Sequence, residues 1–525
     1  MLPILREIKQ NTKKYVVRFG ELNLSENYQD GDFSNTLNVS SHLFPCLTQR
    51  YKRNIGGVYE EPQAVYSKDG LLVIHNSKVM YKAKDETEFV EVGTVAEGEK
   101  QIATVGKYIV IYPDKVCYDT VDRVFESLGA EWSGYRLKVY PDSLFFSPRY
   151  TPDSAPPFPF KKGDGVRVVI RKLGFDKVLT IKETYDDGEG LLFNNYTFPV
   201  DENATDSDQN IYTVNLKREI PDLEYICESN MRLWGVKDNT IYASKYNDPF
   251  NFNSFEHLSD DSYAIDVGTE GNFTGCMPYS NYICFFKENL IHKLYGTKPS
   301  DFRVITSPVP GVQSGSEKSI KNVNGTLFYK GLNGVYAYGG GTPELISSNF
   351  GTKRFTDAVA ESDGERYYVS MKEGEKWGLY VFDLATKTWL REDETHALDM
   401  AVCDNKVHIL TDDGELSIVD RGSIDETSEW SVTFCPFNET INEKKVYSKF
   451  HLRLDLGEKA WLCVEIKRDT DTKWQTVFTT HNERERTVSI PVMPTRCDSV
   501  EIRLSGKGKC ILKTFIREYQ TGSDV

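Results

Sequence analysis

A short pattern of apolar and polar residues recurs along the chain. Residues 72–81 read LVIHNSKVMY, residues 109–118 read IVIYPDKVCY, and a looser copy, RLWGVKDNTIY, occupies 232–242. In each copy, a short apolar run leads through a polar turn into a second apolar run, as in a β-hairpin. Repetition of one hairpin predicts a circular array of small sheets.

Similar hairpins recur at intervals of roughly 40 residues, a spacing typical of β-propeller blades. Helical periodicity is nearly absent, so we expect an all-β chain with a propeller of about six to eight blades. The Asn-Gly pairs at 324–325 and 333–334 are predicted to form tight hairpin turns. Seven candidate units are recognised, at 64–82, 101–120, 225–244, 273–296, 319–340, 365–389 and 397–420.

Changes in this rhythm predict the domain boundaries. The polar N-terminal stretch is expected to be an extended arm that packs on another protein and gains order on assembly. The proline-rich stretch TPDSAPPFPF (151–160) is interpreted as a linker into an inserted, small β-barrel-like domain. Alternating strands near the C-terminus predict a β-sandwich. The predicted layout is arm 1–60, first blades 61–150, insertion 151–221, remaining blades 222–428 and sandwich 429–525.

Composition narrows the possible partners. The 525 residues carry a formal net charge of −15, which argues against a nucleic-acid-binding protein. No segment approaches the roughly 18 apolar residues of a membrane span, and the N-terminus shows no signal-peptide core. The 10 cysteines are scattered without a CxxC pair, so we expect reduced, individually packed thiols.

No motif predicts catalysis, a metal or a cofactor. The 8 histidines are dispersed without HExxH, and no GxSxG elbow or Walker loop occurs. His75 and His408 lie in or beside apolar strands and are interpreted as structural. The glycines at 339–341 could cradle a phosphate only if a helix followed, and none is predicted. We therefore expect a protein that is not an enzyme.

Acidic turns and one aromatic patch are the remaining candidates. Asp186–Glu189 and Asp412–Glu415 resemble fragments of a calcium loop, but they lack its ligand spacing and are interpreted as solvated turns. Four aromatic side chains within SKYNDPFNFNSFEH either stack a sugar or partner chain, or plug the edge of a blade. These four are Tyr246, Phe250, Phe252 and Phe255.

Four stretches resemble the tail-nozzle, tail-tubular and head-closing stabilisation proteins of tailed bacteriophages. Residues 19–50 resemble the family's opening phrase, although Glu21 interrupts it. Residues 230–252 resemble its "Asn-Arg-Leu-Trp-Gly … Ile-Tyr-x-Ser … Asp-Pro-x-x-Phe" phrase, with Met231 intruding. Residues 307–347 resemble "Gly-x-x-Ser … Gly-Val-Tyr … Pro-x-x-Ile-Ser", and residues 496–525 resemble the closing strands of the family's sandwich.

The resemblance implies a β-propeller virion subunit, arranged as a homo-oligomeric ring, often a hexamer, around the DNA exit channel. Its expected partners are adjacent tail, adaptor and fibre proteins. It would be assembled in the host bacterial cytoplasm and would reside in the virion tail. Viral DNA would pass without sequence-specific binding, and an acidic lumen would repel its phosphates. The family is structural, so no catalytic residues carry over.

Two alternatives stay open at this point. The first is a β-propeller carbohydrate-active enzyme or glycan-binding protein, because propellers host such functions. It would require convergent carboxylates at a pocket. The second is an intracellular interaction propeller, which would lack the N-terminal phrase and the C-terminal sandwich.

Overall fold

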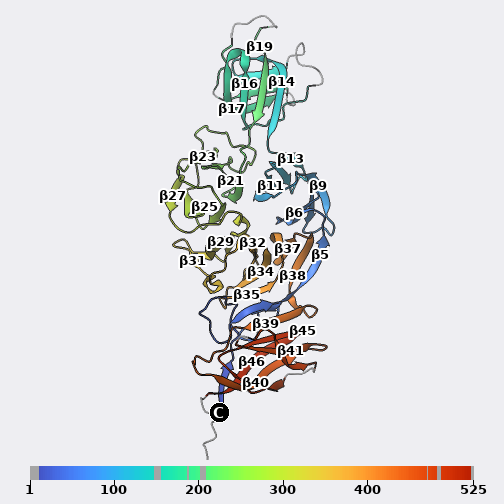
Figure 1. Ribbon diagram of the computed structural model, residues 1–525. Coiled ribbons are helices and arrows are strands. Elements are labelled where there is room, and N and C mark those ends of the chain that lie inside the picture. Colours follow the sequence, from blue (N-terminus) through green and yellow to red (C-terminus); the bar gives the residue numbers. More distant parts are fainter. Residues whose placement is uncertain are drawn as a thin grey trace, which may run out of the picture. The chain divides into compact units, whose positions relative to one another are not determined.

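The structure, a computed structural model, describes residues 11–146, 155–185, 189–194, 196–200, 209–469, 471–481 and 486–521. It is all-β, as the sequence predicts: among the described residues the helical elements are the short 3₁₀ turns η1 (Arg171–Leu173), η3 (Glu317–Ser319) and η4 (Ser348–Phe350). Within the described ranges, no helix has the length and apolar character needed to cross a membrane. The chain forms two compact units: the barrel unit, residues 66–317, and the sandwich unit, residues 1–65 with 318–525 (Figure 1).

Four antiparallel sheets of four strands each occur in the barrel unit, the first beginning at Pro62 just before the unit boundary. Their strands are β6 (Pro62–Ser67), β7 (Gly70–His75), β8 (Lys78–Ala83) and β9 (Val90–Thr94); β10 (Gln101–Val105), β11 (Tyr108–Tyr112), β12 (Val116–Asp119) and β13 (Phe125–Ser127); β20 (Tyr225–Ser229), β21 (Arg232–Lys237), β22 (Thr240–Ala243) and β23 (Tyr263–Asp266); and β24 (Gly275–Tyr279), β25 (Tyr282–Lys287), β26 (Leu290–Tyr295) and β27 (Arg303–Ser307).

Three further sheets of four strands occur in the sandwich unit. The last of them takes its fourth strand, β5 (Tyr51–Val58), from the N-terminal part of the chain, because β5 pairs antiparallel with β38. The other strands are β28 (Lys321–Val323), β29 (Thr326–Gly331), β30 (Gly334–Tyr338) and β31 (Glu344–Leu345); β32 (Thr356–Ser362), β33 (Arg366–Glu373), β34 (Lys376–Asp383) and β35 (Thr388–Asp393); and β36 (Ala397–Cys403), β37 (Lys406–Thr411) and β38 (Glu415–Ile424).

Each of the seven hairpin units recognised in the sequence falls in a different four-stranded sheet. The middle strands are buried on both faces, which is why they read as continuous apolar runs: in β25, all residues from Ile283 to Lys287 are buried. Two-residue turns with positive φ close the hairpins, as at Asn324 (50°) and Gly325 (80°). The second predicted Asn-Gly turn is shifted by one residue, because Gly331 pairs with Gly334 and leaves Leu332 and Asn333 as the turn.

A closed six-stranded barrel interrupts the barrel unit between β13 and β20 (Figure 1). Around the barrel the order is β14-β15-β18-β17-β16-β19, and apolar side chains such as Leu137, Val168 and Leu216 fill it. The strands are β14 (Ala130–Val139), β15 (Ser143–Phe146), β16 (Gly165–Ile170), β17 (Phe175–Tyr185), β18 (Gly190–Phe193) and β19 (Ile211–Arg218).

The barrel begins at Ala130, so the predicted start of the insertion at residue 151 is wrong. The cause is the proline-rich stretch, which the sequence analysis interpreted as a linker. Its described part, 155–160, belongs to the connection between β15 and β16. Phe158 and Phe160 from this part lie in the barrel core, and the Trp132 indole donates to the Pro156 carbonyl (2.8 Å). Residues 151–154 lie outside the described residues.

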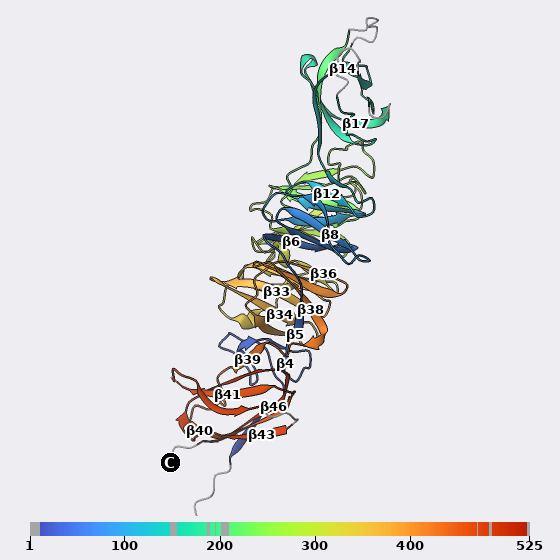
Figure 2. The same cartoon turned by 90° about the vertical axis from the view of Figure 1, so that its right-hand side faces the viewer.

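Two five-stranded sheets pack face to face as a sandwich (Figure 2). The alternating strands predicted near the C-terminus are present, and the chain's N-terminal segment adds two more: β1 (Thr12–Val16) pairs with β46, and β2 (Phe33–Leu37) with β39. The other strands are β39 (Glu429–Phe434), β40 (Lys445–Leu456), β41 (Trp461–Arg468), β42 (Gln475–Thr480), β43 (Arg486–Pro491), β44 (Arg496–Cys497), β45 (Val500–Lys507) and β46 (Cys510–Thr521); β3 (Val39–Ser40) and β4 (Thr48–Gln49) form a separate pair.

The N-terminal segment therefore differs from the predicted arm. Its described part is ordered within the single chain, because strands β1, β2 and β5 are all hydrogen-bonded within the sandwich unit. Phe19 and Phe33 enter the core of the sandwich. Pairing with distant strands of the same chain compensates the low apolar content that made this segment look disordered.

Two buried arginines fasten β5 to its neighbours. Arg53 pairs with Glu392 (2.6 Å) and Asp393 (2.8 Å) at the end of β35, and all three side chains are largely buried. Arg50 pairs with Asp425 (3.0 Å) just beyond β38. Burial by itself would lower the pKa of Arg53, but the attraction of Asp393 and Glu392 outweighs it and raises that pKa. These ion pairs hold β5 both to β35 of the preceding sheet and to the end of β38 in its own sheet.

One carboxyl group of the N-terminal segment makes stability depend on pH. Burial raises the pKa of Glu21 from 4.5 to about 7, and the charge of Asp32 adds to this, against the N–H of Trp389, which donates to Glu21 Oε2 (3.1 Å). The folded chain therefore holds a proton that the unfolded chain releases between pH 4.5 and 7. Because the unfolded state binds fewer protons in that window, stability falls as pH rises through it.

We expect Glu21→Gln to reduce this loss of stability between pH 4.5 and 7, which amounts to at most about 1.4 kcal/mol per pH unit. Urea unfolding at a series of pH values measures the slope. Glu26→Gln, at an exposed position of the same segment, is the control and should retain the wild-type slope. An unchanged slope in Glu21→Gln would contradict the assignment.

Candidate functional site: the seat of the barrel

Two chain connections join the barrel to the four-stranded sheets of its unit, and Arg218 ties them together. Arg218, the last residue of β19, donates from Nε to the Leu128 carbonyl in the incoming connection (2.9 Å). Its Nη1 pairs with Asp164 (2.7 Å), and both side chains are about 5% exposed. The guanidinium also lies 5.1 Å from the centre of the Phe250 ring.

Asp164 also contacts the segment between β22 and β23, residues 244–262, which we call the seat loop. The Asn251 amide donates to Asp164 Oδ1 (3.2 Å) and accepts from the Gly165 N–H (2.9 Å) at the start of β16. Asn251 also donates to the Asp248 carboxylate, whose burial raises its pKa. The barrel thus rests on the seat loop through buried, charge-assisted hydrogen bonds, which are the stronger kind.

Arg232 of β21 holds the seat loop by hydrogen bonds to its backbone. This arginine is 1% exposed and donates to three backbone carbonyls: Ser244 (2.8 Å), Ser259 (2.9 Å) and Asp261 (2.5 Å). Carbonyls at both ends of the loop are therefore gathered by one side chain. A loop of 19 residues acquires a fixed shape in this way, which is what a rigid support for the barrel requires.

The aromatic patch of the sequence analysis divides within the seat loop. Phe250 and Phe252 are buried at 7% and 3% exposure and pack among apolar residues of the four-stranded sheets. Tyr246 and Phe255 are more than half exposed. The buried pair corresponds to the plugging interpretation, and the exposed pair remains available to a partner chain or sugar.

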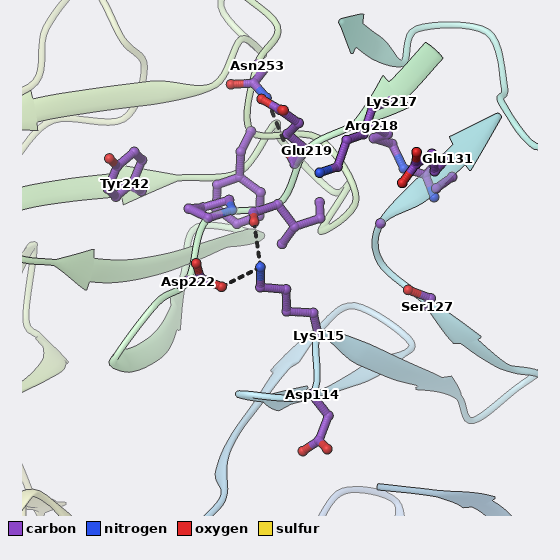
Figure 3. Close-up of a pocket in the computed structure, with 15 residues that line it drawn as sticks. Asp114, Lys115, Ser127, Glu131, Lys217, Arg218, Glu219, Asp222, Tyr242 and Asn253 are labelled. Carbon is purple, nitrogen blue, oxygen red and sulfur yellow. Dashed lines mark hydrogen bonds and ion pairs between the residues drawn. The ribbon is translucent and has the colours of Figure 1, made fainter. Parts of the chain in front are cut away.

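A cavity of about 590 Å³ lies beside Arg218, lined by both connections and by residues of the sheets (Figure 3). Lys115, in the turn between β11 and β12, crosses toward the outgoing connection, where it donates to the Ile220 carbonyl (2.9 Å) and pairs with Asp222 (2.5 Å). The attraction of Lys115 lowers the pKa of Asp222. The cavity is thus spanned by structural ties between sheet and connection.

Close backbone approach at Gly165 offers a test of the seat. A Cβ at this position would lie 2.7 Å from the carbonyl oxygen of Asn253 in the seat loop, a contact between backbones that side-chain movement cannot relieve. We expect Gly165→Ala to destabilise the barrel unit by about 1–3 kcal/mol. Urea unfolding measures the loss, and Gly339→Ala, where no atom lies within 4 Å of the added Cβ, should be neutral. Equal effects would contradict the close fit.

The other candidate residues are dispersed. His408 is buried and bonds the Lys406 carbonyl through Nδ1 (3.0 Å), and His75 ends β7. Gly339 and Gly341 lie in an exposed loop. Asp413 closes its own turn by accepting from the Thr411 hydroxyl. Of the other acidic turn, Asp186, Asp187 and Gly188 lie outside the described residues.

No group of three or more His, Cys, Asp or Glu side chains among the described residues could hold a metal ion. All 10 cysteines are free thiols, as the sequence predicts, and Cys117, Cys284 and Cys435 are among those whose pKa burial raises to about 12. A thiol with so high a pKa is a poor nucleophile at neutral pH.

The sequence did not indicate the seat, since neither Arg218 nor Asp164 belongs to a recognisable motif. No spacing rule connects residues 164, 218, 232 and 251. The signal available was the phrase at 230–252, in which Arg232, Ser244, Asp248 and Asn251 all turn out to build the seat loop.

Comparison with known proteins leaves the family open. No protein-family model and no curated protein matches the chain. Similar solved structures include a chain of the Mitotic Checkpoint Complex (8% identity, TM-score 0.37, 70% of this chain and 94% of that chain covered). Others are an exo-β-1,3-galactanase from Phanerochaete chrysosporium (9%, TM-score 0.20, 55% and 92%) and an exported protein from Bacteroides fragilis (10%, TM-score 0.27, 70% and 84%). Every TM-score is below 0.5, so these likenesses carry no argument.

Proposed function

We propose that this chain is a structural subunit of a bacteriophage tail, a nozzle or tail-tube ring through which DNA is ejected. Copies of the chain form a homo-oligomeric ring, and the barrel and sandwich are attachment platforms for adjacent tail, adaptor and fibre proteins. The ring is assembled in the host bacterial cytoplasm and acts in the virion.

The main support for the proposal is that polar residues in 230–252, the stretch that resembles the phage family, form buried structural hydrogen bonds. Three of these residues form hydrogen bonds that hold the barrel against the four-stranded sheets of its unit: Arg232, Asp248 and Asn251. A protein selected for rigid display needs such residues, whereas an enzyme would turn comparable groups toward a substrate. Arg50, Arg53 and Arg218 serve the same purpose elsewhere in the chain.

In this proposal the seven four-stranded sheets are the blades of one β-propeller. Support comes from the connectivity of six of the sheets, which are simple antiparallel meanders, and from β5, which completes the seventh with an N-terminal strand. Closing a circular array with a strand from the opposite end of the chain protects the array from opening at its first and last members.

Electron microscopy of the purified protein, and of virions labelled with an antibody against it, tests the assignment. We expect closed rings of identical subunits and labelling confined to the tail. A chain that stays monomeric at high concentration and degrades a polysaccharide would overturn the proposal in favour of the carbohydrate-active alternative.

A second measurement addresses the conduit. The net charge of −15 should keep duplex DNA from adhering to the ring, so fluorescence anisotropy should detect no binding even at low salt, where electrostatic binding is strongest. Tight, salt-sensitive binding would contradict the passage of DNA without retention.

A further inference from the structure

A second cavity, of about 760 Å³, lies in the sandwich unit, and its walls come from three turns. These are the β33–β34 turn, with Trp377 just after it at the start of β34, the β35–β36 connection with His396, and the β37–β38 turn with Asp412. Its volume is within the range of pockets that hold small molecules. The acidic turn Asp412–Glu415, interpreted from the sequence as merely solvated, is part of this wall.

One wall is an aromatic pair held in a fixed orientation. The rings of Trp377 and His396 stack with centroids 3.7 Å apart and an interplanar angle of 15°. His396 Nδ1 lies 2.8 Å from Asp412 Oδ2, so the imidazole is fixed from its other side by a hydrogen bond to that carboxylate. Trp377 is partly exposed and is not a member of either of the two apolar clusters to which other residues of β34 contribute.

The floor of the cavity is built from groups that already have partners. Arg53 is bound by Glu392 and Asp393, and Arg50 by Asp425 and the Asn38 side chain (2.8 Å). Asp425 also accepts from the hydroxyl groups of Thr427 (2.8 Å) and Ser428 (2.7 Å). Because both arginines are nine-tenths buried and paired, they stiffen the floor and do not form a receptor for an anion.

Charge decides which class of ligand fits. The lining contains four Lys or Arg side chains and seven Asp or Glu side chains, so phosphates, nucleic acids and acidic sugars are repelled. The rim carries the carboxylates of Asp413, which accepts from the Thr411 hydroxyl, and of Glu394, which pairs with Arg391 (3.0 Å). Each carboxylate has further lone pairs that can accept from a ligand. Carboxylates accept hydrogen bonds from ligand hydroxyls, and an indole face takes the apolar face of a sugar ring.

We propose that this cavity is a binding site for a neutral oligosaccharide, with Trp377 as the stacking surface and Asp412, Asp413 and Glu394 as acceptors for sugar hydroxyls. The site is one of recognition. It is independent of whether the chain forms a ring, because every lining residue lies in the sandwich unit of a single chain.

Saturation-transfer NMR on the purified full-length chain tests the site. The probes are linear hexasaccharides of glucose, galactose, mannose and N-acetylglucosamine, with a sulfated glucose hexasaccharide and a lysine hexapeptide as charged comparators. We expect at least one neutral hexasaccharide to bind and the sulfated one not to bind. Trp377→Ala should weaken the affinity by about tenfold or more, equivalent to about 1.4 kcal/mol.

Two further variants keep the test specific. Trp474→Ala removes an indole that lies beside Arg503 (4.5 Å) elsewhere in the same unit, and it should leave binding unchanged. Trp377→Phe retains a ring and should recover part of the affinity lost in Trp377→Ala. Failure of all four neutral hexasaccharides to bind, binding of the lysine peptide alone, or unchanged affinity in Trp377→Ala would overturn the proposal.

Discussion

We expect Arg517→Met to lower the unfolding free energy of the sandwich more than a substitution at its surface does. Arg517 on β46 and Glu439 are both fully buried and joined by two hydrogen bonds, Nε to Oε1 (2.7 Å) and Nη2 to Oε2 (3.1 Å). The guanidinium also lies 3.7 Å from the centre of the Phe437 ring. Removing Arg517 leaves the buried Glu439 carboxylate with the more distant, partly exposed Lys14 (3.5 Å) in place of its close partner, at a cost of about 3–5 kcal/mol.

Denaturant unfolding, combined with hydrogen exchange in peptides from β40 and β46, measures this loss. Arg503→Met is the matched control, because Arg503 is one-third exposed where it pairs with Glu465 in the same sandwich, and pairs open to solvent contribute about 0–1 kcal/mol. Adding Glu439→Gln to Arg517→Met should recover part of the stability, since the stranded charge is then removed. A loss below about 1 kcal/mol in Arg517→Met would refute the role given to this pair.

Arg218→Met should release the barrel from its seat. The substitution leaves Asp164 buried without its cation and removes the hydrogen bond to the Leu128 carbonyl, so we expect the barrel unit to lose about 3–5 kcal/mol. Amide exchange should accelerate in β14, β16 and the seat loop, while the sandwich unit stays protected.

Arg167→Met provides the control on the same barrel. Arg167 pairs with Asp176 (2.8 Å), but both side chains are more than 40% exposed, so solvent screens the pair and its loss should change stability little. Similar exchange in the two variants would mean that the buried network does not hold the barrel.

The sequence predicts local structure in this chain far better than long-range structure. Hairpins at 72–81 and 109–118, and alternating strands such as 445–456, follow from apolar periodicity and from turn residues such as Asn324 and Gly325, which are local properties. The sequence predicts an arm at the N-terminus because the strands that pair with this segment lie several hundred residues away, at β38, β39 and β46. No period in residues 11–58 encodes those pairings.

The barrel boundary and the two sites were obscured for a related reason. Prolines 156, 157 and 159 indicate a break in strand structure wherever they occur, and nothing local separates a linker from a loop that contributes Phe158 to a core. The seat and the Trp377 cavity each combine side chains from three or more separate segments. Such a convergence is a property of the fold, and among 525 residues it cannot be selected from spacing alone.

The placement of β5 affects how the protein can be made. Residues 51–58 are synthesised long before their partner strand β38, which begins at Glu415, and the partners of β1 and β2 come later still. At about 5–20 residues per second, the early segment stays without its native partner for roughly 20–70 s. A translation product that stops before β38 can therefore complete neither the sheet that holds β5 nor the sandwich, so such a nascent chain differs in structure from the folded subunit.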